Sequence, residues 1–295
     1  MRKPLYVSIS GGLGNQLFMF ATALSLSVQW SRKLVLIDSW YEGYQRGEAY
    51  AHHRRTFDLL KFPVIAKNHR VANRVENKLI SILENIHFGK RIDLSSIGFQ
   101  NLDEIAPGKS IKPKNFLYGY MQEPLRFLHV MDLMRDLLQL PEEEQVTTKG
   151  QIRRKREGAE RLIAVHVRRG DYAHPEMFGC LLTGEYFRNA MGNFDLNRSK
   201  VLIFSDSPEW CEQDPYLGQF EVVKESSATV SLIMMSLCDD FIVSPSTFSW
   251  WGAQLGNSEG KIVVAPRPYN EFNSETWEQF VQENWIREPA IFESK

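Results

Sequence analysis

Two arginines follow a short apolar run in the second half of the chain. The run, residues 162–167, has the composition of a buried strand, and Arg168, Arg169 and Asp171 stand at its end. A guanidinium is a permanently charged, planar fork that holds two phosphate oxygens at once. Two guanidinium groups at one strand end therefore suit a diphosphate, although a cluster of surface ion pairs would use the same residue types.

A hydroxyl-rich segment follows another apolar run, residues 241–243. In this segment Ser246, Thr247 and Ser249 stand where the pattern predicts the first turn of a helix. The free N–H groups and the dipole at a helix start favour a phosphate, and the hydroxyls would cap the helix. Capping alone would also account for Ser246.

A glycine turn near the N-terminus is the third candidate. The run Gly11-Gly12-Leu13-Gly14 separates an apolar stretch, residues 5–9, from a helix-periodic one, residues 15–30. Glycines between a strand and a helix let the backbone approach a ligand closely, and they leave N–H groups at the helix start. A tight turn without a ligand needs the same residues, so the glycines alone leave both interpretations open.

The elements that must position these residues alternate between strand and helix. In the second half the expected strands are 162–167, 201–204, 220–223, 241–243 and 262–264, and the expected helices are 184–191, 228–237 and 247–255. The first half begins with strands 5–9 and 34–37 around helix 15–30, followed by a helix near 72–86 and a strand near 115–120. Such alternation predicts parallel, doubly wound sheets, in which ligands bind beyond the carboxyl ends of the strands.

A polar, charge-dense segment separates the two halves. Residues 142–160 include the run Arg153-Arg154-Lys155-Arg156. This composition fits a solvated helix or an interdomain linker better than a binding patch. We therefore predict two domains, residues 1–150 and residues 151–295.

Composition narrows the function classes. A chain of 295 residues with 43% hydrophobic content can bury a sizeable core, and its net charge of -1 argues against nucleic-acid binding. The three cysteines, Cys180, Cys211 and Cys238, have no C-x-x-C spacing and support neither a disulfide framework nor a zinc site. No Asp-x-Asp pair follows a strand, so we expect no metal, with arginines in its place.

The N-terminus contains neither a signal peptide nor a membrane anchor by pattern. Residues 17–28 are apolar-rich, but they are too few to span a bilayer, and Thr22, Ser25 and Ser27 interrupt them. We therefore expect a cytoplasmic protein, with peripheral attachment to a membrane left open.

Taken in order, four motifs resemble one family. They are Gly12-Leu13-Gly14-Asn15-Gln16, HxRRxD at 166–171, SDxPxWC at 205–211 and STFSWW at 246–251. The chain resembles the fucosyltransferases of glycosyltransferase family 11, over nearly its whole length. Two smaller elements, Gly119-Tyr120-Met121-Gln122 and Thr56-Phe57-Asp58-Leu59, also resemble segments of that family.

The resemblance implies a GT-B-like fold with two Rossmann-type α/β domains and the donor site in the C-terminal one. It implies inverting, metal-independent transfer of L-fucose from GDP-β-L-fucose to a hydroxyl of an oligosaccharide or lipid-linked glycan, with O2 of a terminal galactoside as the expected position. GDP-fucose is then a substrate, and no cofactor is implied. Two alternatives stay open: a transferase of the same fold with another donor or linkage, and a non-catalytic nucleotide- or glycan-binding relative. The oligomeric state is also open.

Carried onto this sequence, the resemblance assigns roles residue by residue. Arg168 would stabilise charge on the donor's β-phosphate, with Arg169 in support, and Asp171 completes the predicted catalytic set. The donor-binding residues would be His166, Arg168, Asp206, Ser246, Thr247, Phe248 and Ser249, joined from the other domain by Gly12, Asn15 and Gln16, while Asp38, Tyr120 and Gln122 would lie on the acceptor side.

The general base is open between Asp171, Asp38 and His166. Attack by an acceptor hydroxyl calls for a carboxylate or imidazole within hydrogen-bond reach. Asp171 would alternatively hold Arg168 or Arg169 in an ion pair, and a dissociative transition state would need no strong base.

The sequence departs from the family pattern at three places. Ser231 stands where the family usually has a carboxylate that pairs with guanine, and Glu225 is the acid that could replace it. Pro245 replaces an asparagine, and Met19-Phe20 replaces Gln-Tyr in the glycine motif. GDP remains the expected nucleotide.

Overall fold

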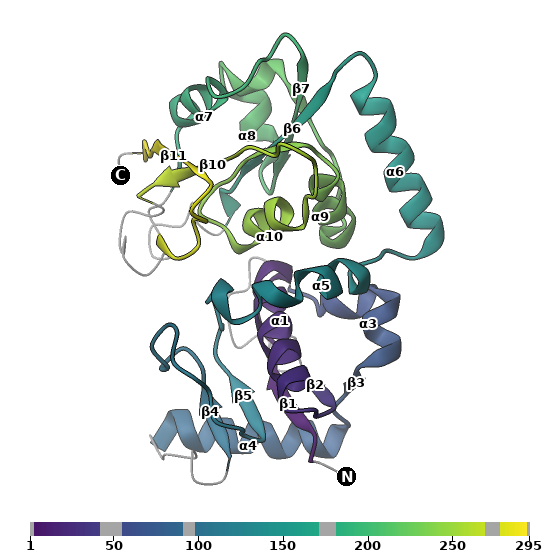
Figure 1. Cartoon of the computed structure of the whole chain (residues 1–295), viewed down its shortest axis with the longest axis vertical. Helices are drawn as coiled ribbons and strands as arrows, with labels where there is room; N and C mark the ends of the chain where they lie inside the picture. Colours follow the sequence, from purple (N-terminus) through teal and green to yellow (C-terminus); the bar gives the residue numbers. More distant parts are fainter. Residues whose placement is uncertain (1–2, 42–54, 91–97, 171–180, 269–277, 294–295) are drawn as a thin grey trace. The chain divides into compact units, whose positions relative to one another are not determined.

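The computed structural model describes residues 3–41, 55–90, 98–170, 181–268 and 278–293, with only the backbone over 84–90. The chain forms two compact units, Met1–Gln139 and Leu140–Lys295. Each unit contains one parallel sheet flanked by helices (Figure 1). The expectation of two α/β domains built on parallel sheets is confirmed.

The boundary between the units differs from the one expected at residue 150, which falls inside α6 (Glu142–Arg156). This helix is polar along most of its length, but it buries Thr148 and Ile152. It packs against α9 (Ala228–Ser236) of the second unit. Because α6 contributes to the core of that unit, the boundary moves to the residues before the helix, Gln139 and Leu140.

The first unit is built on a five-stranded sheet in the order β3-β2-β1-β5-β4. All strand pairs are parallel, and Leu5 of β1 lies opposite Leu34 of β2. The strands are β1 (Leu5–Ser8), β2 (Leu34–Ile37), β3 (Arg70–Val71), β4 (Phe99–Asn101) and β5 (Phe116–Tyr118). The helices are α1 (Leu13–Gln29), α3 (Pro63–Asn68), α4 (Arg74–Lys90) and α5 (Met131–Leu137), with 3-10 turns at Asp58–Lys61, Pro124–Arg126 and Leu128–Val130.

Helix α1 is buried over almost its whole length. A helix that is apolar around most of its circumference belongs in a core, and the hydroxyls that interrupt this one bond to backbone carbonyls. Ser25 donates to Arg126 O at 2.8 Å, Ser27 to Leu24 O at 2.8 Å and Thr22 to Met121 O at 3.4 Å. The apolar run near the N-terminus is therefore a core helix of the first unit.

The second unit is built on a six-stranded sheet in the order β11-β10-β9-β6-β7-β8, parallel throughout. Its strands are β6 (Arg161–Val167), β7 (Ser199–Ser205), β8 (Glu221–Val222), β9 (Asp240–Ile242), β10 (Val263–Arg267) and β11 (Ile286–Pro289). Besides α6 and α9, its helices are α7 (Gly184–Met191), α8 (Pro208–Gln213) and α10 (Thr247–Leu255), with a 3-10 turn at Leu217–Gln219. In Figure 1, α7 and α8 lie on one side of this sheet, and α9 and α10 lie on the other.

Both sheets reverse their strand order beside a central strand. In the second unit the chain passes from β6 outward to β7 and β8, and then returns to the other side of β6 as β9. In the first unit the same reversal falls between β1 and β5. Loops diverge at such a reversal, and ligands of open α/β sheets bind in the crevice that results. The fold therefore indicates two candidate binding places. One is at the ends of β6 and β9, and the other is at the ends of β1 and β5.

Within the described part of the chain, none of the helices combines the length and the apolar character that spanning a bilayer requires. Cys211 and Cys238 are buried free thiols, and Cys180 lies outside the described residues.

Candidate active site

Arg168 and Asp206 meet across two neighbouring strand ends. Arg168 follows β6 and Asp206 follows β7, its parallel neighbour. The Arg168 Nη1 lies 2.6 Å from Asp206 Oδ2, and Asp206 Oδ1 accepts the Arg169 backbone N–H at 2.9 Å. The carboxylate thus fixes both the loop after β6 and the direction of the first guanidinium.

Gly170 makes this arrangement possible because its lack of a side chain leaves room for the Asp206 carboxylate. A Cβ at this position would lie 2.3 Å from Asp206 Oδ2, closer than any real contact. A side chain at residue 170 would therefore push the carboxylate away from both arginines.

The Arg169 side chain is held by two partners of its own. Its two terminal nitrogens bind the two oxygens of Glu293 at 2.7 and 3.0 Å, and its guanidinium carbon lies 3.9 Å from the centre of the Trp210 ring. The side chain is only 12% exposed. A two-point ion pair combined with a cation–π contact gives a guanidinium a single orientation.

Ser244 ties the ends of β6 and β9 together. Its hydroxyl donates to His166 O at 2.5 Å and accepts from the Arg168 backbone N–H at 3.3 Å. The side chain is buried. The loop that carries the arginines is therefore bonded to the loop that leads into α10.

The hydroxyls around the start of α10 have distinct partners. Ser246 is the N-cap and accepts from Phe248 N at 3.3 Å, as the sequence pattern suggested. Ser249 is fully buried and donates to Ser244 O at 2.9 Å and to Ser246 O at 3.0 Å, so its hydroxyl shapes the turn. Thr247 and Phe248 are half-buried on the first turn.

His166 is a neutral, buried imidazole. It is 4% exposed, its ring centre lies 5.5 Å from that of Phe248, and among the described residues its Nδ1 has no hydrogen-bond partner. Burial lowers the pKa of His166 to about 4, Asp206 opposes that shift, and Arg168 adds to it. With so low a pKa, His166 is a weak base at neutral pH.

In the first unit, the glycine motif and the Gly119-Tyr120-Met121-Gln122 segment meet at the ends of β1 and β5. The Gln122 side-chain amide donates to Asn15 Oδ1 at 3.0 Å. Gly11 has a φ of +74°, which a glycine adopts without strain, and Gly12 precedes α1 without a capping side chain. The fold thus brings together residues that are more than a hundred positions apart.

Gln16 is fully buried, and its side-chain amide forms its hydrogen bonds within the first unit. Its Nε2 donates to Gly11 O at 3.0 Å and Thr56 O at 2.7 Å, while its Oε1 accepts from the N–H groups of Asp58 and Leu59 at 2.9 and 3.1 Å. The Thr56-Phe57-Asp58-Leu59 segment is therefore anchored by the glycine motif, and Gln16 holds it in place.

The turn after β5 is held in an unusual conformation by Asp103. Gly119 has a φ of +104° and Met121 a φ of +54°, and Asp103 accepts from the N–H groups of Tyr120 and Met121 at 2.6 and 2.7 Å. A non-glycine residue in the left-handed region is strained, and such residues gather at functional sites. This turn leaves the Tyr120 ring 50% exposed.

Asp38 follows β2, next to β1, and its Oδ1 accepts from the Nδ2 of the buried Asn77 at 2.6 Å. Tyr41, on the same segment, donates from its hydroxyl to Gly11 O at 2.9 Å. Asp38 and the glycine turn thus lie at the same edge of the sheet.

The structure therefore gathers the predicted residues into one group in each unit. Asp171 lies outside the described residues, so its choice between base and ion-pair partner stays a prediction. Four residues that sequence reasoning gave no role now have one: Gly170, Asp103, Trp210 and Glu293. Of these, only Trp210 carried a signal, as part of the SDxPxWC motif.

The comparison with protein families decides the affiliation. The family described as Glycosyl transferase family 11 matches residues 63–289. The chain belongs to glycosyltransferase family 11. It is therefore a glycosyltransferase, and its two parallel-sheet units follow the GT-B-like plan.

Relatives of this family 11 enzyme include two from Escherichia coli that it matches almost end to end. The O-antigen biosynthesis glycosyltransferase WbnK is 28% identical, with 96% of this chain and 99% of that protein aligned. An alpha-1,2-colitosyltransferase is 25% identical, with 95% and 97% aligned. The human galactoside alpha-(1,2)-fucosyltransferase 1 is 28% identical over 40% of this chain and 35% of its own length.

The fold is also similar to that of solved fucosyltransferases. The NodZ alpha-1,6-fucosyltransferase co-crystallized with GDP superimposes with a TM-score of 0.51, at 17% identity, with 85% of this chain and 92% of that chain covered. Arabidopsis thaliana FUT1 in complex with GDP also gives a TM-score of 0.51, at 13% identity, with 92% and 72% covered. At these identities the likeness supports the fold.

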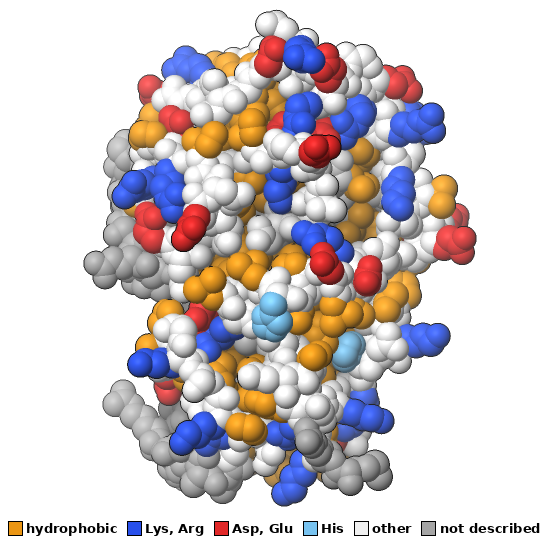
Figure 2. Space-filling model, viewed as in Figure 1, with side chains coloured by type: hydrophobic (Ala, Val, Ile, Leu, Met, Phe, Trp, Pro, Cys, Tyr) orange, Lys and Arg blue, Asp and Glu red, His pale blue; other side chains and the backbone are white. Residues whose placement is uncertain are grey.

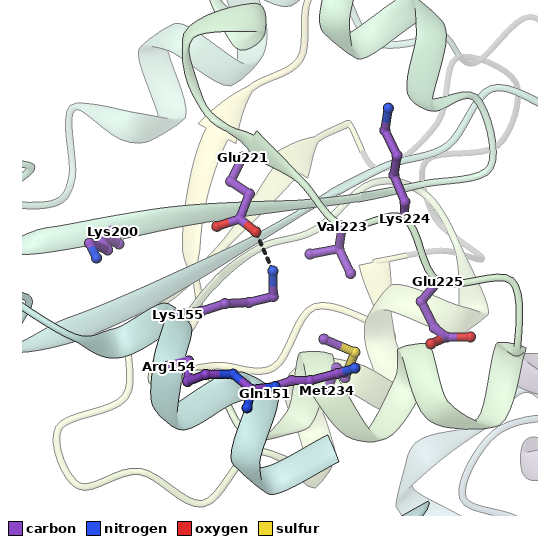
Figure 3. A pocket seen from close by; sticks show the side chains of 9 residues that line it. All are labelled: Gln151, Arg154, Lys155, Lys200, Glu221, Val223, Lys224, Glu225 and Met234. Carbon is purple, nitrogen blue, oxygen red and sulfur yellow. Dashed lines mark hydrogen bonds and ion pairs between the residues drawn. The ribbon is translucent and has the colours of Figure 1, made fainter. Parts of the chain in front are cut away.

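A hollow of about 380 Å³ lies on the second unit of the family 11 enzyme (Figure 3). Its lining comes from α6, β7, β8, the loop after β8, and α9: Gln151, Arg154, Lys155, Lys200, Glu221, Val223, Lys224, Glu225 and Met234. Lys155 and Glu221 form an ion pair across it. The lining includes neither Arg168 nor Asp206, so the hollow is separate from the residues that are candidates for binding the donor diphosphate.

Glu225, which lines that hollow, also stands beside the start of α9. Its Oε1 accepts from Ser227 N at 2.7 Å, and Ser227 caps the helix on which Ser231 lies half-buried. The acid considered as a replacement for the missing carboxylate is thus close to Ser231 in the fold. The other two departures are buried: Pro245 in the loop before α10, and Met19-Phe20 within α1.

Charge at the site is a local feature. Lys and Arg side chains alternate with Asp and Glu over the face shown in Figure 2, in keeping with the net charge of -1. An anionic donor would therefore be attracted by the arginines themselves rather than by a field of the whole protein.

Proposed function

We propose that this enzyme transfers L-fucose with inversion from GDP-β-L-fucose to a glycan hydroxyl, O2 of a terminal galactoside. The observation that carries the proposal is the meeting of Arg168, Asp206 and the start of α10 where the second sheet reverses its strand order. The human relative, a galactoside alpha-(1,2)-fucosyltransferase, supports the sugar and the linkage. The GDP complex of NodZ supports the nucleotide.

The donor diphosphate binds between Arg168 and the first turn of α10. A guanidinium carries five N–H donors, so Arg168 can hold Asp206 and phosphate oxygens together. The backbone N–H groups near Ser246 and Thr247 add the positive end of the helix dipole. As the bond from the sugar to the β-phosphate breaks, negative charge grows on the phosphate, and a cation already in place stabilises it.

Arg169 supports the Arg168 guanidinium while it keeps its own contacts with Glu293 and Trp210. Its guanidinium is committed to Glu293 and Trp210, and its backbone N–H fixes Asp206. It therefore keeps the loop after β6 in one shape and adds positive potential to it.

The nucleoside is contacted from the same edge by His166 and Asp206. His166 is neutral because burial lowers its pKa, so it serves as a hydrogen-bonding and packing group rather than as the base. Asp171 or Asp38 takes the proton of the attacking hydroxyl, which bonds to the anomeric carbon opposite the leaving GDP. Asn77 holds Asp38 in place for that task.

The acceptor sugar contacts the first unit. Tyr120 offers an exposed ring on a fixed turn, and Gln122 and Asn15 offer polar groups beside it. Gly12 lets the backbone approach, while Gln16 acts indirectly by holding the motif together.

A second candidate function is transfer of a different sugar by the same site. The colitosyltransferase relative is nearly as similar as the O-antigen transferase, and Ser231 replaces the expected guanine-binding carboxylate. These two observations favour testing a colitosyl donor and other nucleotides beside GDP-fucose.

The test is a transfer assay with purified enzyme, a β-galactoside-terminated acceptor and a panel of nucleotide sugars, all in excess EDTA. We expect turnover with GDP-fucose and an α-1,2 linkage in the product by NMR. Turnover with only a colitosyl donor would establish the second candidate. Failure with every donor, restored by magnesium or manganese, would contradict the proposed metal independence, and failure with every donor and metal would rule out transfer to a terminal β-galactoside.

A further inference from the structure

Helix α4 carries an apolar stripe on its outward face. Val75 is 76% exposed, Leu79 56% and Ile82 48%. Spacings of four and three residues place these side chains on one side of a helix. Figure 1 shows α4 as the long blue helix beside β4 and β5. We call Val75, Leu79 and Ile82 the α4 stripe.

The α4 stripe is additional to the face that anchors the helix. Asn77 and Ile80 point into the unit, where Ile80 packs in a cluster with Val35, Ile37 and other residues of the sheet. Single exposed apolar residues are ordinary, but a contiguous group of them marks a surface that contacts another apolar surface. The fold does not need this stripe for its own core.

Two cations border the α4 stripe. Arg74 and Lys78 are exposed, four residues apart, and each immediately precedes a stripe residue. The acid on the opposite flank, Glu76, is bound by Arg70 and by the Tyr6 hydroxyl, and the hydrogen bond from Arg70 is the main reason that its pKa falls to about 2. The stripe is thus basic along one side, and the neighbouring carboxylate is neutralised by its partner.

We propose that α4 binds the surface of an anionic lipid bilayer, lying parallel to it. The stripe would enter the boundary between headgroups and acyl chains, and Arg74 and Lys78 would reach the lipid phosphates. A basic amphipathic helix with a narrow apolar face has the composition that such binding requires.

A second copy of the chain fits the α4 stripe less well. A stable dimer buries roughly 1,200–2,000 Å² in total, far more than three side chains supply. Two such helices packed together would also bring Arg74 and Lys78 of both copies close to one another, and like charges repel. An anionic bilayer has neither difficulty.

The experiment is co-sedimentation of purified enzyme with vesicles, without donor or acceptor, so that its result is independent of the transfer reaction. One set of vesicles contains phosphatidylglycerol and phosphatidylcholine in equal parts, and the other contains phosphatidylcholine alone. The variants are Leu79→Ser with Ile82→Ser, and Arg74→Glu with Lys78→Glu. Val146→Ser is the matched control, because Val146 is a single exposed apolar residue on another helix, 68% exposed on α6.

We expect the wild type and Val146→Ser to sediment with the phosphatidylglycerol vesicles and to be released by salt. The stripe variant should lose this binding, and the charge-reversal variant should weaken it roughly tenfold or more. Circular dichroism and transfer to a soluble acceptor should be unchanged in all variants.

Three outcomes would overturn the proposal. The wild type would fail to bind the anionic vesicles, or both double variants would bind them as the wild type does. In the third, light scattering would find a dimer that the stripe variant dissociates, and a second copy would then be the occupant.

Discussion

The two adjacent arginines of the site are held in different ways. Arg169 is bound at both ends of its guanidinium by Glu293 and covered by Trp210, whereas Arg168 shares Asp206 with the backbone of its neighbour. A group with two strong partners of its own has little reason to move when a ligand arrives. We therefore propose that Arg168 is the cation that binds the donor diphosphate, while Arg169 keeps its loop in place.

The first prediction concerns Glu293 as a positioning residue. In Glu293→Gln the two-point ion pair becomes a single hydrogen bond to an uncharged amide oxygen, so Arg169 should loosen and KM for GDP-fucose should rise roughly threefold to tenfold, the size of one charge-assisted bond. The kcat should change little, and Glu293→Asp should recover part of the loss. Steady-state kinetics measure this, with Glu212→Gln as the control because its pair with Lys224 is exposed. Equal KM values in Glu293→Gln and wild type would show that Trp210 alone positions Arg169.

The second prediction concerns the buried imidazole. His166 has a pKa of about 4 when folded and about 6.5 when unfolded, so between these values only the unfolded chain binds the proton. Its contribution to stability is therefore present above pH 6.5 and is lost as the pH falls toward 4, by about 3 kcal/mol in all. Urea unfolding of wild type and His166→Asn at several pH values measures the difference. Parallel pH profiles for the two proteins would mean that His166 titrates normally in the folded state.

Among the elements, those with clear capping residues were predicted best. Helices α7 and α10 begin and end at the expected residues, because Thr183 and Ser246 cap them and apolar periodicity continues to their ends. The short edge strands β3 and β11 were missed, because they are two and four residues long and show no buried alternation. A strand of this kind is defined by its neighbour in the sheet, which the sequence pattern does not show.

The contacts of the site were predicted in part for a similar reason. Motifs at strand ends indicated Arg168, Asp206 and Ser246, since parallel strands bring their carboxyl ends to one edge. The pairing of Arg169 with Glu293 joins residues 124 positions apart, through a segment without a motif. No spacing rule relates such positions, so only the folded chain reveals the pair.

The third prediction tests how closely the loops after β6 and β7 approach. In Gly170→Ala the new Cβ would displace the Asp206 carboxylate, which would then release the Arg168 guanidinium and the Arg169 backbone N–H, so donor affinity should fall by roughly tenfold. Global stability should fall little, because a side-chain end can move. Calorimetry with GDP measures the affinity. Gly150→Ala is the matched control, since nothing lies near its Cβ within α6, and it should leave GDP binding intact while adding about 0.5–1 kcal/mol of stability. Unchanged GDP affinity in Gly170→Ala would place the donor away from Asp206.

For the whole molecule, the same design occurs twice. Each unit has a parallel sheet whose strand order reverses beside its central strand, and each reversal gathers motif residues from distant parts of the chain. The second unit supplies arginines and a helix start, whereas the first supplies a strained turn, an exposed tyrosine and a carboxylate. This division matches a transferase that binds an anionic donor with one unit and a neutral sugar acceptor with the other.

We propose that Arg168 stabilises the leaving nucleotide at the strand reversal of the second sheet, and kcat for fucosyl transfer by Arg168→Ala tests this role most directly. Arg198→Ala is the control, because Arg198 forms an exposed ion pair with Glu160 on the same unit. Folding is checked by the urea midpoint of each variant. We predict that Arg168→Ala folds normally and loses roughly 100-fold to 1,000-fold in kcat, the usual cost of removing one preorganised group from a developing charge, while Arg198→Ala keeps wild-type activity. A folded Arg168→Ala enzyme whose kcat stays within about threefold of wild type, a change of less than about 1 kcal/mol in the barrier, would contradict this role of Arg168.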